Sequence, residues 1–299
     1  MHNRYQNTLE LHLKCDRDRP YLSDLSDLSE LSNCAHQTIC AHQYTTYPLR
    51  LSTVFRLEGA NTSRAYLYTM NTSPGLLAKD ALKVDLKLAE NAHLYLTDQA
   101  ATKVHPMPIE SSQATVDYQI ELRSHASLEL VPEPIILYSE AALTQNTAVR
   151  LDRTAKLFLS EIVLPGRLAR GEYYQFRYYF NRLTLTDLGG KLLFTDATRL
   201  QGKANAFKDN HLFAPLPVMG SAIAIYPNLD LTQLSKALDN IQSVHFPSIM
   251  VSNSILPSDC GLLIRGFAHK AVQLKQYFKL ALEHIRKLAN QPALPYVPK

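Results

Sequence analysis

Alternation of apolar and polar residues dominates the chain between Pro48 and Phe213. In residues 82–88, leucine and valine occupy every second position, with lysine and aspartate between them. Residues 114–122 follow the same rule, and residues 176–185 repeat it with aromatic side chains. A period of two places one row of side chains against a core and the other in water, so each segment predicts a half-buried strand. Many such strands without helical segments between them predict a β-dominated body.

The last third of the chain changes to the three-to-four-residue spacing of amphipathic helices. Four apolar residues at this spacing predict a helix over 231–241, with Asp230 or Thr232 as its N-cap. A longer helix is predicted from about 269 to 290, and Pro292 ends it. Its apolar stripe consists of Leu274, Phe278, Ala281, Ile285 and Leu288, widened by Tyr277 and Leu282. Packing on the sheet is the default role of this stripe, but its width also makes Tyr277 and Leu282 candidates for binding a partner helix.

Two segments lack the periodicity of either element. Residues 22–32 repeat leucine every third position between serine and acidic residues, and this period matches neither a helix nor a strand. We therefore expect a flexible insertion at 16–44, after an N-terminal strand over residues 9–13, and a loose tail at 292–299. No linker divides the body, so residues 1–299 are expected to form a single domain.

Composition excludes several classes of protein. The 299 residues are 46% hydrophobic and carry a net charge of only +4, and lysine and arginine never form a run of five, which argues against nucleic-acid binding. Residues 1–20 lack the apolar stretch of a signal peptide, and no window has eighteen apolar residues. The four cysteines include no CxxC pair, so free thiols and a cytoplasmic location are expected.

Polar residues are concentrated directly after the alternating strand at 82–88 and its successor. Thr97, Gln99, Thr102 and Lys103 fall within seven residues of one another. They are candidates for a polar lining or an interface. The alternative is a strand with one wet face, in which threonine and glutamine contact their cross-strand neighbours.

Residues 96–105 also resemble the "LTTQAATK" signature of the urease accessory protein family UreD, which is also called UreH. Asp98 stands where the family usually has threonine, and His105 stands where an aromatic residue is usual. Four further segments resemble the same family in the same order. The turn at 71–80 keeps Gly75 and Asp80 but has Pro74 in place of a glycine, and residues 128–134 resemble the motif "LE-x-x-P-x-P". Residues 166–172 match "GR-x-x-x-GE" and are preceded by Glu161, and residues 261–265 resemble the segment before the last helix.

The resemblance implies a mainly β fold, an elongated multi-stranded stack with two C-terminal helices. It also implies an accessory role without enzymatic activity. Members of the family bind the protein UreF, which recruits the GTPase UreG, and the assembly docks on apo-urease and assists GTP-dependent nickel insertion. Nickel is thought to pass through the interior, so transient nickel and no tightly bound cofactor are expected.

Isolated carboxylates and amides suit a cation in transit, because a tight cage would trap it. The candidates for a nickel path are Asp80, Gln99, Glu129, Glu161 and Glu172. In the alternative, Asp80 caps a turn and Glu172 pairs with Arg167 or Arg170. Arg167 is also a candidate interface residue.

Cys34, His36, Cys40 and His42 have the chemistry of a tight metal site. Their spacing, C-x-H-x3-C-x-H, differs from the common zinc frameworks, and the alternative is a drifted duplication inside the insertion.

Two other functions remain open. Glu161 and Glu172 would be the carboxylates of a carbohydrate-active or carbohydrate-binding β-protein. The chain has no tryptophan for a sugar platform, however, and no hydrolase, zinc-protease or phosphate-loop motif. Metal storage by the Cys/His segment is the third possibility.

Overall fold

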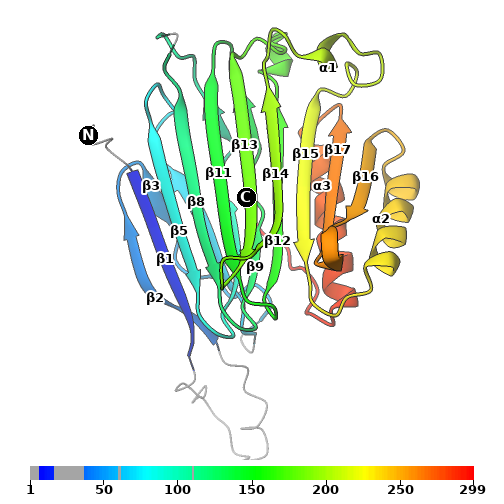
Figure 1. Cartoon of the computed structure of the whole chain (residues 1–299). Coiled ribbons are helices and arrows are strands. Elements are labelled where there is room, and N and C mark those ends of the chain that lie inside the picture. The colour runs from blue at the N-terminus through cyan, green and yellow to red at the C-terminus, as the bar shows by residue number, and fades with distance from the viewer. Residues whose placement is uncertain (1–6, 17–36, 60–61, 110) are drawn as a thin grey trace, which may run out of the picture.

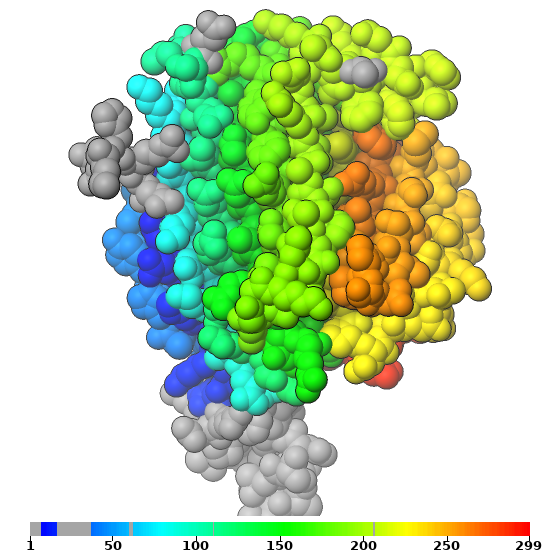
Figure 2. Space-filling view, viewed as in Figure 1, coloured from blue at the N-terminus to red at the C-terminus, as the bar shows by residue number. Residues whose placement is uncertain are grey.

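The structure is a computed structural model that describes residues 7–16, 37–59, 62–109 and 111–299. In these residues seven strands form one sheet, sheet A, and ten strands belong to a second, sheet B, which lies behind it (Figure 1). Sheet B extends past sheet A on one side, and two helices pack there. Figure 2 shows the same division on the surface, where the chain from about residue 218 onward forms the yellow and orange flank.

Sheet A contains, from edge to edge, β14 (Leu192–Leu200), β13 (Tyr178–Asp187), β11 (Ala142–Leu151), β8 (Ala114–Leu122), β5 (Ala81–Leu88), β1 (Asn7–Asp16) and β2 (Gln37–Thr45). Sheet B contains β16 (Met250–Ile255), β17 (Leu262–Ala268), β15 (Val218–Ile225), β12 (Lys156–Leu164), β9 (Ser127–Leu130), β6 (His93–Asp98), β4 (Ala65–Asn71) and β3 (Leu49–Leu51). Two short strands, β7 (Thr102–Val104) and β10 (Ile135–Leu137), pair with each other, and β10 also pairs with β12.

From β4 to β13 the chain passes back and forth between the two sheets. β4, β6, β9 and β12 are parallel neighbours in sheet B, and β5, β8, β11 and β13, which alternate with them along the chain, are parallel neighbours in sheet A. Parallel neighbours need a crossover connection, usually a helix. Here the crossover is a strand of the opposite sheet, so the chain winds as a coil with one strand in each layer.

This winding stacks equivalent residues of successive coils. Leu88, Leu122 and Leu151 are register partners across sheet A, and all three are buried between the sheets. Leu94, Leu128 and Leu157 form the corresponding row in sheet B. The apolar residues of the alternating segments therefore form rows of side chains between the two sheets. The expected β-dominated body is confirmed.

The other face of sheet B packs against helices α2 (Leu231–His245) and α3 (Ala271–Leu288), which enclose a second apolar core. Asp230 caps α2 by accepting a hydrogen bond from the Gln233 backbone N–H at 2.9 Å. A short helix, α1 (Ala206–Asp209), and 3₁₀ turns at Leu168–Arg170 and Pro257–Asp259 complete the described elements. None of the described helices has the length and apolar character needed to cross a membrane.

Two sequence predictions are corrected here. The expected flexible insertion at 16–44 is wrong for Asp16, which ends β1, and for residues 37–44, which form most of β2 at the edge of sheet A. Residues 17–36 lie outside the described residues. The expected loose tail at 292–299 lies against the body, with Leu294 and Val297 packed on the second core.

Candidate functional site

A cavity of about 180 Å³ lies between the two sheets. Its sheet A wall comes from β1, β5, β8 and β11, and its sheet B wall from β4, β6, β9 and β12. Much of the lining is aliphatic, but it also carries polar side chains. They include the exposed Gln99 and Lys103, the partly buried Asp98 and Gln145, and the buried Glu161, and we call this set the polar row.

Backbone contacts fix the outer end of this row. Leu76 N–H donates to the Lys103 carbonyl at 2.7 Å, and His105 N–H donates to the Leu76 carbonyl at 2.9 Å. Gly75 has φ +149°, and a Cβ there would lie 2.4 Å from the Lys103 carbonyl oxygen. Only glycine permits this approach. The turn at 71–80 therefore positions the polar segment that follows β6.

Glu161 is the most unusual group in the site. The carboxylate, 7% exposed, accepts hydrogen bonds from Gln145, Tyr179 and Asn181, all on sheet A. Among the described residues no lysine or arginine pairs with it. Burial raises its pKa above the usual range of a glutamate, although the three donors act in the opposite direction. A buried carboxylate without a counter-charge is costly, and a passing cation would relieve that cost.

Asp98 is a second carboxylate on the cavity wall. Its carboxylate accepts a hydrogen bond from the Thr69 hydroxyl and another from the Glu133 backbone N–H at 3.2 Å. Burial raises the pKa of Asp98 to about 6. The carboxylate is therefore mostly ionised at neutral pH and is protonated by a fall of about one pH unit, and a neighbouring cation would favour its charged form.

A second, smaller cavity shares Glu161 with the first. It is also lined by Asn181 and Asp196, and Asp196 pairs with Arg265 at a half-exposed position. Asn181 donates its amide N–H to Glu161, and its amide oxygen is buried without a hydrogen-bond partner in the described residues. Glu161 therefore belongs to the lining of both cavities, and Asp196 to that of the smaller one.

Gln145, Asn181 and Asp196 were missed in the sequence. The signal was present: in 143–151 the inward positions are Leu143, Gln145, Thr147, Val149 and Leu151, so a glutamine interrupts an apolar row. Asn181 interrupts the equivalent row of β13, and the two residues are register partners.

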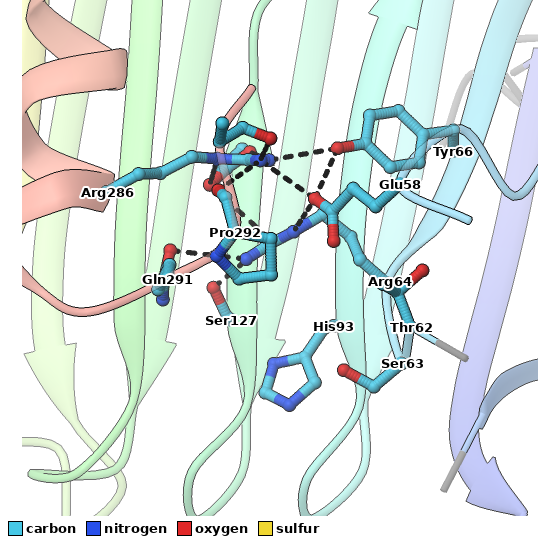
Figure 3. A network of polar contacts seen from close by, with 12 residues as sticks. Glu58, Thr62, Ser63, Arg64, Tyr66, His93, Ser127, Arg286, Gln291 and Pro292 are labelled. Atoms are coloured by element: carbon cyan, nitrogen blue, oxygen red, sulfur yellow. Dashed lines mark hydrogen bonds and ion pairs between the residues drawn. The ribbon is translucent and has the colours of Figure 1, made fainter. Parts of the chain in front are cut away.

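The other predicted path residues have different surroundings. Glu129 lies in a buried ion network beneath α3, where Arg286 Nε donates to its Oε1 at 2.8 Å. Arg286 also donates to Glu58 at 2.8 Å and to the Tyr66 hydroxyl at 3.1 Å, and Arg64 lies 3.3 Å from Glu58 (Figure 3). Two arginines therefore neutralise two glutamates. Glu129 does not line either of the two cavities, and its place on a nickel path stays a prediction.

Glu172 and Asp80 also have structural partners. Glu172 pairs with Arg167 at 2.5 Å and accepts the Ser139 backbone N–H. A Cβ on Gly166 would lie 2.2 Å from the Glu172 carbonyl oxygen, so the "GR-x-x-x-GE" segment folds back on itself around a 3₁₀ turn. Asp80 accepts the Leu77 backbone N–H at 2.8 Å and closes the turn at 71–80. Neither carboxylate lines the described cavities, and their place on a nickel path stays a prediction.

The predicted interface residues separate into three groups. Thr102 and Lys103 line the cavity, and Thr97 is buried beside it, donating its hydroxyl to the Val131 carbonyl at 2.6 Å. Arg167 is partly exposed and lies 4.4 Å from the centre of the Tyr138 ring. Tyr277 and Leu282 are 0% and 1% exposed. The prediction that they receive a partner helix is wrong, because the second core needs the full width of the stripe.

The Cys/His segment is only partly described, because Cys34 and His36 lie outside the described residues. On β2, Cys40 is half-buried, whereas His42 is exposed and lies 3.2 Å from Glu10. Within the described chain no three His, Cys, Asp or Glu side chains converge to hold a metal ion.

Fold and site together define a two-sheet β-stack with a cavity between its sheets that is lined in part by polar side chains. The model of the family described as UreD urease accessory protein matches residues 28–299. A urease accessory protein UreD of Trichodesmium erythraeum is 49% identical over 273 residues, which is 91% of this chain and 98% of that protein. Similar proteins of the same name from Photorhabdus laumondii and Haloarcula marismortui are 28% and 27% identical, over 73% and 87% of this chain and 69% and 85% of their own lengths. The chain belongs to the UreD urease accessory protein family.

Proposed function

We propose that this protein assists the maturation of urease by conducting nickel ions between its two sheets. It acts without catalysis of its own, in the cytoplasm, in complex with UreF, the GTPase UreG and apo-urease, and nickel is its cargo during GTP-dependent insertion. One observation carries the proposal: carboxylate and amide oxygens line two cavities between the sheets, and the two cavities share the buried Glu161, which has no basic partner among the described residues.

The chemistry of the row suits transit. Ni²⁺ accepts oxygen ligands but is held most tightly by sets of nitrogen and sulfur donors, and the row offers oxygens spaced singly. Each step therefore replaces part of the hydration shell without trapping the ion. The carbohydrate alternative finds less support, because binding sites for organic ligands are usually about 300–1,000 Å³, and the main cavity is about 180 Å³.

Glu161→Gln tests the proposal, because it keeps the shape of the side chain and removes the charge. Urease matured with this variant should contain several-fold less nickel, measured by elemental analysis of the purified enzyme. Assembly should be unchanged, measured by co-purification with urease and the other accessory proteins. The variant should be at least as stable as the parent, because an unpaired buried charge is removed.

Glu283→Gln is the matched control. Glu283 lies on the outer side of α3, where its side chain is 34% exposed and 3.7 Å from Lys279. It should leave nickel loading intact. Full loading with Glu161→Gln would refute transit past this residue, and loss of assembly would assign Glu161 to the fold or an interface.

A further inference from the structure

The Lys299 ammonium sits in a group of three oxygen atoms, each at 2.7 Å: the Glu133 carboxylate Oε1, the Thr97 hydroxyl and the Asp98 carbonyl. Glu133 and Asp98 also line the cavity. We propose that these oxygens form a cation site at the cavity wall, which we call the oxygen cage, and that Lys299 occupies it as a displaceable plug. The proposal deepens the proposed function, since the cation that displaces the plug would be the cargo.

The cage has the construction of a cation site. An ammonium offers three N–H donors and no acceptor, so three oxygens at hydrogen-bond distance satisfy it completely. The Thr97 hydroxyl proton is directed to the Val131 carbonyl, which leaves its oxygen lone pairs for the cation. The Glu133 carboxylate is itself held by Lys275 at 2.7 and 2.8 Å, so it stays in place when Lys299 leaves.

The segment that carries Lys299 is attached by side-chain contacts and by the packing of Leu294 and Val297, without a helix or strand. Residues 292–299, here called the strap, contain no helix or strand. The strap accepts hydrogen bonds from Arg286 at the Pro292 and Ala293 carbonyls, and from the Tyr68 hydroxyl at the Pro298 carbonyl. Side chains of the body therefore hold it, and Tyr296 between these anchors is 80% exposed.

The ligand class follows from the donor atoms. Carboxylate, hydroxyl and carbonyl oxygens suit a partly hydrated divalent cation and bind Ni²⁺ only weakly. Metal–oxygen distances are a few tenths of an ångström shorter than 2.7 Å, so the cage must contract slightly around the ion. The nearby Asp98 carboxylate supplies further negative charge. Weak binding in competition with an ammonium permits rapid exchange at the cavity wall.

Nickel binding to the isolated full-length protein tests the cage without urease. Lys299→Met removes the ammonium and keeps an unbranched side chain. Calorimetric titration of Lys299→Met with Ni²⁺ alone should show one site whose affinity is at least about tenfold higher than in the parent. The gain should vanish in Lys299→Met combined with Glu133→Gln, and Lys299→Arg should retain the parent affinity. Lys279→Met, on the outer side of α3, is the matched control for loss of a surface cation.

Strap release has its own readout, because the chain has no tryptophan. Tyr296→Trp would introduce a single reporter at an exposed position, and its fluorescence anisotropy should fall as Ni²⁺ displaces Lys299. Unchanged affinity in Lys299→Met, or a gain that persists without the Glu133 charge, would overturn the cage. Constant anisotropy during Ni²⁺ binding would overturn the plug. These results are independent of nickel loading by Glu161→Gln, so failure of the cage and failure of transit are distinguishable.

Discussion

At the scale of single residues, buried charge has two opposite forms in this protein. Glu129 and Glu58 are enclosed with Arg286 and Arg64, so each charge is neutralised within the network. Burial alone would lower the pKa of Arg286, but the hydrogen bonds and charge of Glu129 raise it above its usual value. Glu161, in contrast, has only neutral donors. The first arrangement joins α3 to sheet B, and the second leaves Glu161 without a positively charged partner among the described residues.

Arg286→Met should strongly destabilise the protein, because it leaves Glu129 and Glu58 without their shared partner. Removal of one member of a buried ion pair costs about 3–5 kcal/mol. Urea unfolding at neutral pH measures the loss. Lys287→Met, at the next and exposed position, should change the free energy of unfolding by less than about 0.5 kcal/mol. A loss below 1 kcal/mol for Arg286→Met would contradict the importance of the network.

His93 should make folding sensitive to acid. Burial, together with the charges of Arg64 and Lys156, lowers the pKa of His93 to about 4. An unfolded histidine titrates near 6.5, so below that pH the unfolded chain binds a proton that the folded chain does not. The neutral His93 therefore makes its full contribution to the free energy of unfolding above about pH 6.5. As the pH falls towards 4, the free energy of unfolding decreases by about 1–3 kcal/mol because of this residue.

The comparison of the parent with His93→Leu isolates this effect, because the other acid-titrating groups are common to both. The difference between their free energies of unfolding, measured in urea from pH 7.5 to 4.5, should shift in favour of the variant as the pH falls. A pH-independent difference would show that His93 titrates normally in the folded state.

At the scale of elements, α3 holds two parts of the molecule together. Its inward side supplies Leu274, Tyr277 and Leu282 to the second core, and Arg286 to the ion network. Its other side carries Lys275, which binds Glu133 at the edge of the cavity. The helix therefore connects the core beneath sheet B to the wall of the candidate site, and its packing controls the position of Glu133.

Leu282→Ala should lower the free energy of unfolding by about 2–5 kcal/mol, because it opens a hole in a packed core. Thermal unfolding followed by circular dichroism measures the change. Val272→Ala is the control on the same helix, since Val272 is 50% exposed. If Leu282→Ala weakened binding of a partner protein without loss of stability, the residue would have to face that partner, against its position in the structure.

At the scale of the whole molecule, the sequence predicted the elements better than their arrangement. The period of two identified the strands at 82–88 and 114–122, and the helical spacing located α2 and α3. The coil was not predicted, because alternation tells which side chains point inward but not which strand lies alongside. The parallel neighbours in each sheet are separated by about one full coil of sequence, and no local pattern records that pairing.

The site follows the same rule. Glu161 and Gln99 were proposed from the family resemblance and do line the cavity. Glu129, Glu172 and Asp80 were proposed on the same grounds. In the folded chain each of them has a structural partner, which is Arg286, Arg167 and the Leu77 backbone N–H respectively. Gln145 and Asn181 were missed because a polar residue on an inward row gains meaning only when the facing sheet is known.

The winding of the chain between sheets also determines how the molecule responds to force. Each coil is bonded to the coil before and the coil after it, and the antiparallel strands β2 and β14 cover the ends of sheet A. In such a nearest-neighbour stack, the interface between adjacent coils is the unit of cohesion. A pull applied along the stack would load these interfaces in series, and the chain would come away coil by coil from an exposed end. The cavity, whose walls include strands of several consecutive coils, would lose its shape when the first of them detached.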